Sequence, residues 1–399
     1  MIYSFGDCTI DTARHAFMRG GAPVHLEPQV FALLTELARA HGALVSKDQL
    51  VQSVWQGLAI SDATISARIN AARTALGDTG REQRVIRTVP KRGFQLVPEV
   101  SGQDEQDRPL PVQPAAPARP APTVGFATAA DGTLIAHSVS GTGPPLMRVG
   151  HWLSHLELDW RCPVWQPLLA RMGRDFTLHR YDQRGTGLSG RDLVRTDLDD
   201  FVGDLLAVAD AAGLARFAIF AASQAVPVAI RFAARHPERV SRMVLYGGFA
   251  VGRALRPERS GEMDENTVLG LIRAGWGQPE SAFFQAFIRL FMPDGTPEQI
   301  ASFARVQSQS ITAANAAGLR MAVDRFDVSD DLEEVRAPTL VIHARDDAIQ
   351  PIAQSQRIAG AIPGARFMTL DGRNHVMLPQ EPGWAELMQA VSEFCLRAE

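Results

Sequence analysis

The feature that most constrains this chain is a proline-rich segment about a quarter of the way along it. Residues 101–122 read SGQDEQDRPLPVQPAAPARPAP, in which six of the 22 residues are Pro and the large aliphatic residues are Leu110 and Val112. Such a segment cannot bury a core and favours extended, polyproline-type backbone. We therefore predict two domains, residues 1–100 and 123–399, joined by a linker over residues 101–122.

The composition excludes several other classes of protein. No stretch approaches the roughly 18 to 20 uncharged apolar residues that span a bilayer. The opening sequence MIYSFGDCTIDTARH lacks the basic-then-apolar pattern of a signal peptide. Three cysteines, Cys8, Cys162 and Cys395, lie far apart without metal-ligand spacing, which indicates reduced thiols. We expect a cytoplasmic protein with no membrane contact, no metal and no cofactor.

The first hundred residues contain short strands, three helices and a hairpin, in that order. Alternating apolar runs predict the strands, helical spacing predicts the helices, and a PKRG turn predicts the hairpin. Ser46 caps the second helix, and Gly77 with Asp78 ends the third. The predicted strands are 2–5, 8–10 and 16–19, the helices 28–40, 46–55 and 61–76, and the hairpin strands 85–89 and 94–97.

This order of elements resembles the winged-helix DNA-binding domain of the OmpR/PhoB type. Four stretches carry the resemblance in family order: FGDCTID, LEPQVFALLTELARAHGALVSKDQLVQSVW, SDATISARINAARTALGD and VIRTVPKRGFQL. It implies an α+β domain whose helix from Ser61 enters the DNA major groove while the hairpin forms a wing. The DNA contacts that we expect on this face are Trp55, Thr64, Ala67, Arg68, Asn70, Ala71, Arg73, Lys91 and Arg92.

Within that set, the resemblance implies that Arg68, Asn70 and Arg73 reach bases or phosphates. The local charge agrees, because residues 68–92 carry seven basic and two acidic side chains, a net charge of +5. Phosphate contacts of this kind supply affinity and make binding salt-dependent. A winged helix used for protein contacts alone stays open as an alternative.

An N-terminal winged helix followed by a further domain is similar to the CadC-like arrangement of regulators. In two-component proteins of the OmpR/PhoB family, a phosphoacceptor domain precedes the winged helix. Here the winged helix comes first, so we do not expect phosphorylation to be the input. No membrane helix follows the linker, and we therefore expect a cytosolic signal.

Beyond residue 122, apolar strand-like runs alternate with helical segments. This alternation predicts an α/β fold with a mainly parallel sheet. A continuous apolar run such as FAIF suits a strand that is buried on both faces. The predicted strands are 134–139, 146–149, 176–181, 217–220, 240–246, 339–343 and 366–370, and the predicted helices are 164–172, 198–212, 225–235, 352–361 and 384–396.

A serine stands where one of these strands turns into a helix. Ala221 and Ala225 lie two residues before and two after Ser223, so the segment reads AxSxA. A nucleophile elbow has the form GxSxG, because its turn is so sharp that small side chains alone fit around the serine. Further on, ARDDAIQP follows one strand and GRNH follows the next, which gives the chain order Ser, Asp, His.

This order and these strand-end positions resemble the α/β-hydrolase family. The stretches YDQRGTGLS, HPERV and PTLVIH support the resemblance over about residues 123–399. It implies that Ser223 attacks a carbonyl, that His375 takes the serine proton and that Asp347 orients the imidazole. Asp347 is preferred to Asp346 because the acid of the family lies four residues before a proline.

Two further features follow from the same resemblance. The oxyanion hole would consist of the backbone N–H groups of Gln224 and Trp152. The helical, aromatic-rich residues 250–330 would form a cap over an apolar pocket. As an alternative, these aromatic residues form the core of the cap. The predicted pocket residues are Trp152, Ser223, Trp276, Phe287 and His375.

Two functions of different classes remain. The preferred hypothesis is a one-component transcriptional regulator, whose winged helix binds double-stranded DNA and whose second domain senses a small, apolar, carbonyl-containing ligand. We expect it to act as a homodimer on paired half-sites. The alternative is an active serine hydrolase of an ester or lactone that carries the winged helix as a targeting or oligomerising module. A sensor that slowly hydrolyses its own ligand would combine both.

Overall fold

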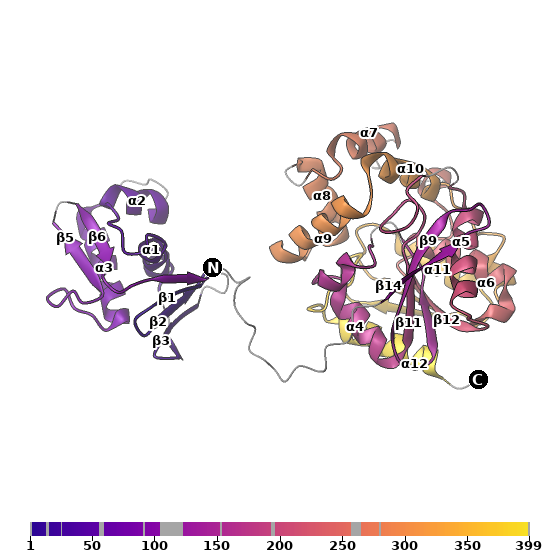
Figure 1. Ribbon diagram of the computed structural model, residues 1–399, viewed down its shortest axis with the longest axis horizontal. Coiled ribbons are helices and arrows are strands. Elements are labelled where there is room, and N and C mark those ends of the chain that lie inside the picture. Colours follow the sequence, from indigo (N-terminus) through magenta and orange to yellow (C-terminus); the bar gives the residue numbers. More distant parts are fainter. Residues whose placement is uncertain are drawn as a thin grey trace. The chain divides into compact units, whose positions relative to one another are not determined.

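The computed structural model describes residues 2–12, 16–24, 26–55, 60–90, 92–103, 123–151, 154–192, 196–256, 265–278 and 281–397 (Figure 1). The chain forms two compact units that divide between Arg119 and Pro120. Each unit has its own hydrophobic core. In the described part of the chain, no helix is both long enough and apolar enough to span a membrane.

The N-terminal domain contains an antiparallel five-stranded sheet in the order β4-β3-β2-β1-β7. Its inward-facing side chains, among them Phe5 and Ile10, are buried in the core of the domain. The strands are β1 (Ile2–Phe5), β2 (Cys8–Asp11), β3 (Ala16–Arg19), β4 (Ala22–Pro23) and β7 (Ser101–Gln103).

Strand β7 corrects the predicted start of the linker. The sequence predicts a linker from residue 101, whereas Ser101–Gln103 pair with β1, with Gln103 opposite Ile2 and Ser101 opposite Ser4. The three residues SGQ carry no apolar side chain, so backbone pairing rather than side-chain burial makes them a strand. The rest of the predicted linker, residues 104–122, lies outside the described residues.

Three helices and a two-stranded hairpin complete the domain. Helix α1 packs against α2, α3 and β6, and Leu33, Leu37 and Ile69 are almost fully buried between them. The predicted ends of these elements differ from the observed ends by no more than one residue. The elements are α1 (Pro28–Arg39), α2 (Lys47–Trp55), α3 (Asp62–Leu76), β5 (Ile86–Val89) and β6 (Gly93–Leu96).

One buried carboxylate organises the loop between α3 and β5. Gly77 ends α3 with a left-handed φ of +64°, which glycine adopts without steric cost. Asp78 follows and is 5% exposed. Its carboxylate accepts hydrogen bonds of 2.8 to 2.9 Å from the backbone N–H groups of Thr79, Arg84, Val85 and Ile86. Burial acts to raise the pKa of Asp78, but these hydrogen bonds outweigh burial and lower the pKa.

The C-terminal domain is built on an eight-stranded sheet in the order β15-β14-β13-β12-β10-β11-β9-β8. The strands from β15 to β11 are parallel, and β9 pairs antiparallel with both β11 and β8. The predicted mainly parallel sheet is confirmed, and β8 is a strand that the sequence analysis missed. The strands are β8 (Val124–Thr128), β9 (Leu134–Gly141), β10 (Pro145–Arg148), β11 (Thr177–Tyr181), β12 (Phe217–Ala222), β13 (Val240–Tyr246), β14 (Thr339–Ala344) and β15 (Arg366–Leu370).

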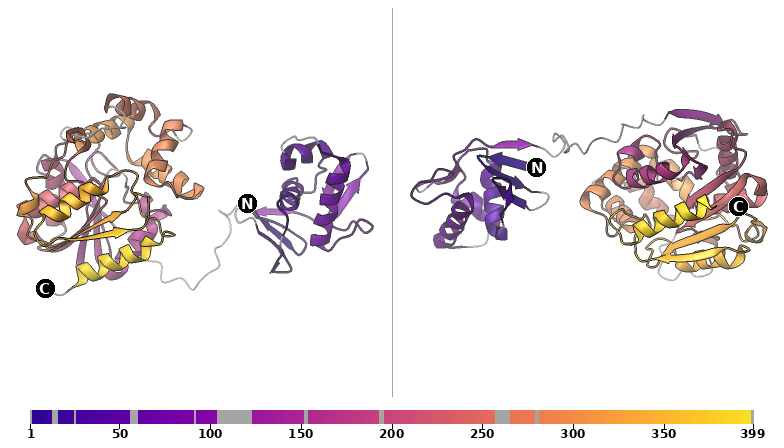
Figure 2. Two further views of the ribbon diagram at one scale, coloured as in Figure 1. Left: turned by 180° about the vertical axis from the view of Figure 1, so that it is seen from behind. Right: turned by 90° about the horizontal axis from the view of Figure 1, so that it is seen from below.

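Helices cover both faces of this sheet (Figures 1 and 2). Helices α4 (Gln166–Asp175) and α12 (Gly383–Leu396) pack together on one face. Helices α5 (Leu198–Ala211), α6 (Ala225–Arg235) and α11 (Ile352–Ala361) pack on the other. The central strands, such as β12 and β14, are therefore buried on both sides, as their apolar sequences predict.

A cap is inserted between β13 and β14 (Figure 1). Its packed surface is rich in Phe, and Phe291 at the end of α8 lies against His375, with ring centroids 5.7 Å apart. The cap therefore contacts the end of the sheet where the candidate site lies. The described helices of the cap are α7 (Glu265–Gly275), α8 (Ala282–Phe291), α9 (Pro297–Ser310) and α10 (Ala313–Val323).

We predict that Asp78→Ala destabilises the N-terminal domain by about 3 kcal/mol, because it leaves the buried N–H of Ile86 and three partly buried N–H groups without their acceptor. The depressed pKa means that the stabilisation is present above the ordinary value of 3.8 and is lost as pH falls through the lower folded value. Hydrogen exchange of the winged-helix amides in the full chain, with increasing urea, measures the change.

Glu82→Ala is the matched control for this prediction. Glu82 is an exposed carboxylate in the same loop that pairs with the exposed Arg84. Its removal should change stability by about 0.5 kcal/mol or less. Equal effects of the two substitutions would contradict the role given to Asp78.

Candidate active site and nucleic-acid interface

Ser223 occupies a strained turn between β12 and α6. Its φ of +55° is left-handed, a conformation that costs a non-glycine residue about 1 to 2 kcal/mol and that is frequent at functional sites. Its N–H donates to the Tyr246 carbonyl at 2.9 Å, and its carbonyl accepts from the Val226 N–H at 3.0 Å. Ala221 and Ala225 are fully buried beside it. The turn therefore has the backbone of a nucleophile elbow with alanines in place of glycines.

Asp347 and His375 form a buried hydrogen-bonded pair. His375 Nδ1 lies 2.7 Å from Asp347 Oδ2, and the two side chains are 2% and 0% exposed. Asp347 Oδ1 accepts from the N–H groups of Ile349 at 2.7 Å and Gln350 at 3.0 Å. Burial acts to raise the pKa of Asp347, but His375 and these hydrogen bonds outweigh burial and lower the pKa. A carboxylate in this position keeps the imidazole proton on Nδ1 and leaves Nε2 as the basic nitrogen.

His343, which the sequence analysis did not select, supports the acid. It lies in β14 with no exposed surface. Its Nε2 donates to the Gln350 carbonyl at 3.1 Å, so its Nδ1 accepts from the Ser355 hydroxyl at 2.8 Å. It therefore holds the loop whose N–H groups bind Asp347. A histidine within the apolar strand TLVIHA, four residues before the acid, is the signal that could have identified it.

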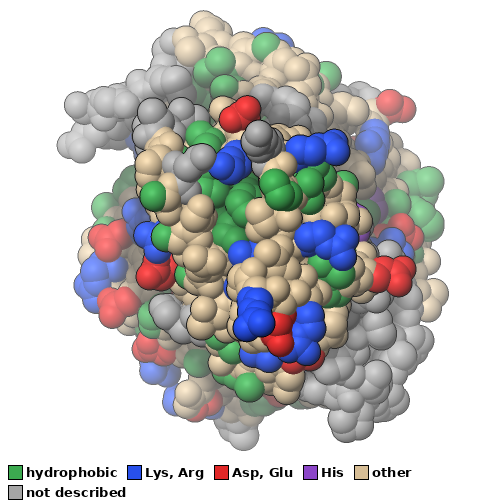
Figure 3. Space-filling view, turned by 90° about the vertical axis from the view of Figure 1, so that its left-hand side faces the viewer, with side chains coloured by type: hydrophobic (Ala, Val, Ile, Leu, Met, Phe, Trp, Pro, Cys, Tyr) green, Lys and Arg blue, Asp and Glu red, His purple; other side chains and the backbone are tan. Residues whose placement is uncertain are grey.

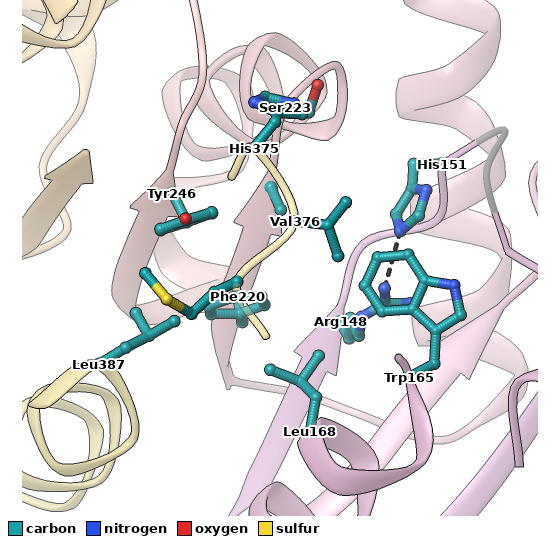
Figure 4. A pocket seen from close by; sticks show the side chains of 12 residues that line it. Arg148, His151, Trp165, Leu168, Phe220, Ser223, Tyr246, His375, Val376 and Leu387 are labelled. Atoms are coloured by element: carbon teal, nitrogen blue, oxygen red, sulfur yellow. Dashed lines mark hydrogen bonds between the residues drawn. The ribbon is translucent and has the colours of Figure 1, made fainter. Parts of the chain in front are cut away.

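Ser223 and His375 line one cavity (Figure 4). The cavity has a volume of about 40 Å³ and a mostly apolar wall. Nε2 of His375 has no hydrogen-bond partner among the described residues, so it is available to receive a proton. The lining residues are Arg148, His151, Trp165, Leu168, Phe220, Ala222, Ser223, Tyr246, His375, Val376, Met377 and Leu387.

Of the two predicted oxyanion donors, Gln224 lies in the described part of the chain. Gln224 follows Ser223 and is the N-cap of α6, where backbone N–H groups and the helix dipole favour negative charge. Its buried side chain donates from Nε2 to Gln183 Oε1 at 2.6 Å. Trp152, the second predicted donor and a predicted pocket residue, lies outside the described residues.

The two cap residues predicted to line the pocket, Trp276 and Phe287, pack against each other. Trp276 is 5% exposed, and its indole N–H donates to the Ile311 carbonyl at 3.2 Å. Its ring packs against Phe287, with centroids 5.2 Å apart. Trp276 and Phe287 line neither of the described cavities that contain Ser223. Because these aromatic rings bury one another, they form the core of the cap.

Ser223 also lines a second cavity, of about 30 Å³. Its wall is basic, because it includes Arg253, Arg256 and Arg320 together with Asp324. Arg320 Nε pairs with Asp324 Oδ2 at 2.8 Å. The serine therefore borders one mostly apolar cavity and one basic cavity.

The outer face of α3 carries small and polar side chains. Of the residues predicted to contact DNA, Ala67 and Asn70 are exposed, while Thr64 and Ala71 are half-buried. Thr74, one turn beyond Asn70, is also exposed, although the sequence analysis did not select it. The small side chains allow a close approach to a DNA groove.

Burial corrects two of the predicted DNA contacts. Arg73 is 5% exposed, and its Nη2 donates to the Ile86 carbonyl at 2.9 Å and to Thr88 Oγ1 at 2.8 Å. It holds α3 to the wing strand β5 and faces the interior. Trp55 is 6% exposed and belongs to the core of the domain. Neither side chain is placed to contact DNA.

The other basic residues predicted to contact DNA differ in their interactions with the rest of the domain. Arg68 stays near the surface, forms an ion pair with Glu27, and donates from Nε to Gln29 Oε1 at 3.0 Å. Arg92 is exposed in the turn of the wing, and Lys91 lies outside the described residues. In Figure 3, Lys and Arg side chains (blue) gather on the face of this domain. The exposed arginines of the loop and wing are Arg81, Arg84, Arg87 and Arg92.

Comparisons with known proteins agree with the division of the chain into two domains. The family model for the C-terminal domain of transcriptional regulatory proteins matches residues 21–96, and the model for the alpha/beta hydrolase fold matches residues 149–382. The putative carbamate hydrolase RutD of Rhizobium rhizogenes is 26% identical over 224 residues, which cover 55% of this chain and 82% of that protein. The transcriptional activator CadC of Escherichia coli is 29% identical over 126 residues, which cover 30% of this chain and 25% of that protein.

Solved structures support the fold of the larger domain. A crystal structure of a hydrolase from Pseudomonas aeruginosa PA01 is 24% identical and superposes with a TM-score of 0.55. The superposition covers 69% of this chain and 97% of that chain. At this level of identity the likeness shows the fold alone.

The fold and site define a winged-helix protein whose second domain carries serine, aspartate and histidine at the ends of three strands of an α/β sheet. The chain belongs to the alpha/beta hydrolase fold family, whose model matches more than half of it. Its N-terminal domain is of the OmpR/PhoB type, which implies DNA binding. Both predicted resemblances are thus confirmed.

We predict that Gly247→Ala disturbs the pair formed by Asp347 and His375. Gly247 has a φ of +55°, and an added Cβ would lie 3.3 Å from Asp347 Oδ2 and 3.5 Å from His375 Cε1. The downfield proton resonance of His375 Nδ1 should therefore shift. The left-handed backbone should also cost about 1 to 2 kcal/mol of stability.

Gly364→Ala separates these two effects. Gly364 has a φ of +69°, but nothing lies within 4 Å of an added Cβ. This control should lose a similar amount of stability and keep the resonance of His375 unchanged. The same resonance shift in both variants, or in neither, would contradict the proposed crowding.

Proposed function

We propose that this protein is a one-component transcriptional regulator of the cytoplasm. Its winged helix binds double-stranded DNA, and its hydrolase-fold domain binds the signal, a small and largely apolar ligand with a carbonyl group. The observation that carries the proposal is that one chain joins an OmpR/PhoB-type winged helix to a domain in which Ser223 and His375 border a mostly apolar cavity.

We further propose that the ligand acts through association of two chains. A ligand held near Ser223 would favour an arrangement of the hydrolase-fold domain that forms a homodimer. Two winged helices would then bind two half-sites, as dimeric DNA-binding proteins do. This route requires no rigid connection between the two domains of one chain.

A second candidate function, hydrolysis of an ester or lactone, is favoured by the geometry of the site. Ser223 has the left-handed turn of a nucleophile elbow, and the unpaired Nε2 of His375 belongs to the same cavity wall. Ser223 Oγ would add to the carbonyl carbon while its proton passes to His375, and the Gln224 N–H would donate to the oxyanion. Water would then release the acyl group and restore the serine. A relative is named as a putative carbamate hydrolase, which adds carbamates to the candidate substrates.

We predict that Ser223→Ala abolishes labelling of the full chain by a fluorophosphonate probe and hydrolysis of short p-nitrophenyl esters. The probe reacts with a serine whose proton a neighbouring base accepts. Asp347→Asn should slow ester hydrolysis by roughly 10⁴-fold, because the imidazole would take the wrong tautomer.

Ser308→Ala is the control for labelling, since it removes from α9 a half-buried hydroxyl that donates to the Arg305 carbonyl and lines neither described cavity at Ser223. It should leave the rate of labelling unchanged. Labelling that survives in Ser223→Ala would contradict the assigned nucleophile. A well-folded wild type that is never labelled would exclude hydrolysis and leave the receptor function in place.

The DNA-binding face is tested by measuring affinity for a DNA duplex that the wild-type protein has selected from a pool of random sequences. Asn70→Ala should weaken binding by about 1 to 3 kcal/mol and relax the preference at one base pair, because Asn reads base edges. Arg92→Ala should weaken binding to all sequences and lower the salt slope by about 1. Arg336→Ala, an exposed arginine of the other domain, should change neither. If Asn70→Ala and Arg92→Ala both bind DNA as tightly as the wild type, this face does not bind DNA.

A further inference from the structure

The apolar cavity beside Ser223 contains a buried positive charge. Arg148 ends β10, is 4% exposed and contributes to the cavity wall. Most of the other wall residues are apolar, and Leu168, Phe220 and Leu387 are among them. Figure 4 shows the guanidinium of Arg148 on the same side of the cavity as His151 and Trp165. A guanidinium in such surroundings requires an explanation, because buried charges are normally paired.

The partners of Arg148 are neutral. Its Nη2 lies 2.7 Å from His151 Nε2, and its Cζ lies 4.9 Å from the centroid of the Trp165 ring. Since a guanidinium can donate but not accept, His151 Nε2 is the acceptor and the ring is uncharged. Burial, followed by the charge of Arg148, lowers the pKa of His151 well below its ordinary value. No described carboxylate forms an ion pair with Arg148, and its Nε has no described partner.

The nearest carboxylates are engaged elsewhere. Asp159 pairs with Arg180 at 2.9 Å, with both side chains buried. Asp182 is fully buried and accepts backbone N–H groups at 2.9 and 3.2 Å. Burial raises the pKa of Asp182 to about 7, so this carboxyl is partly protonated at neutral pH. Burial also lowers the pKa of Arg148 to about 10, which leaves it charged at that pH. Both carboxylates therefore have other partners, and neither forms an ion pair with Arg148.

We propose that the ligand of this cavity is an organic carboxylate, whose anionic group pairs with Arg148 and whose apolar body packs on Leu168, Phe220 and Leu387. A carboxylate presents two acceptor oxygens to a guanidinium, and the resulting hydrogen bonds are charge-assisted and strong in a low-dielectric site. The proposal rests on the function proposed above in taking this cavity as the ligand site. It adds that the ligand is an acid rather than a neutral ester, lactone or amide.

The test compares acids with amides of the same shape. The full chain carrying Ser223→Ala is titrated by calorimetry with hexanoate against hexanamide and with benzoate against benzamide, at pH 7.5. The substitution prevents any turnover. Each acid should bind about tenfold or more tightly than its amide, because it alone gains the charge-assisted pair. Equal affinities of acid and amide would overturn the proposal.

Variants of Arg148 test whether this residue causes the preference for acids over amides. Arg148→Gln, made with Ser223→Ala, should lower the affinity for the acids by about tenfold and leave the amides unchanged, whereas Arg148→Lys should keep the preference for acids. Arg320→Gln is the matched control, since it removes a charge from the basic cavity on which Ser223 also borders. A preference that is lost in Arg320→Gln and kept in Arg148→Gln would overturn the assignment.

Two further measurements separate a folding defect from a loss of binding, and the carboxylate site from the regulator function. Circular dichroism reports whether Arg148→Gln folds, and if it does not, the comparison of acid and amide in Ser223→Ala alone decides. DNA affinity is then measured with saturating benzoate. If the acid binds through Arg148 and leaves DNA affinity and oligomeric state unchanged, the regulator function fails and the carboxylate site stands. If acids show no preference, the carboxylate site fails and the regulator function stands.

Discussion

The site depends on the backbone of Ser223, which is held in a left-handed conformation by the hydrogen bond from its N–H to the Tyr246 carbonyl. This bond joins the turn to the neighbouring strand, so the strain of the turn is opposed by the pairing of β12 with β13. Parallel strands end at one edge of the sheet. The loops after β14 and β15 therefore bring Asp347 and His375 together at the edge where Ser223 lies, although His375 follows Ser223 by 152 positions in the sequence.

Much of this arrangement could be predicted, because the elements that carry it have local signals. Strand and helix periods are visible within about ten residues, and Ser223, Asp347 and His375 each follow a predicted strand. The errors concern residues whose surroundings come from elsewhere in the chain. Arg73 is buried because its acceptors lie on β5, and no local pattern distinguishes it from a surface arginine. His343 and Arg148 are visible as polar residues at apolar strand positions, but the sequence does not say which group each one meets.

The winged helix divides its charged side chains between structure and surface. Asp78 and Arg73 are both buried beside β5, where one accepts from backbone N–H groups and the other donates to a carbonyl. Arg68 is held by Glu27. The recognition helix therefore presents mainly small and neutral side chains, and the exposed arginines belong to the loop and the wing. This division suits a helix that reads base edges while the wing supplies charge to the phosphates.

Strand β7 determines where the winged-helix domain can be cut. It is an edge strand, and its pairing with Ile2, Tyr3 and Ser4 covers the polar backbone of β1. A fragment that stops at Val100 would leave β1 as an open edge, and an open edge offers a template to a strand of another molecule. A fragment that stops at Gln103 keeps β1 covered and leaves the short, polar strand β7 as the edge. Three residues without an apolar side chain thus replace the edge of β1, which carries Ile2, Tyr3 and Phe5, with a shorter polar edge.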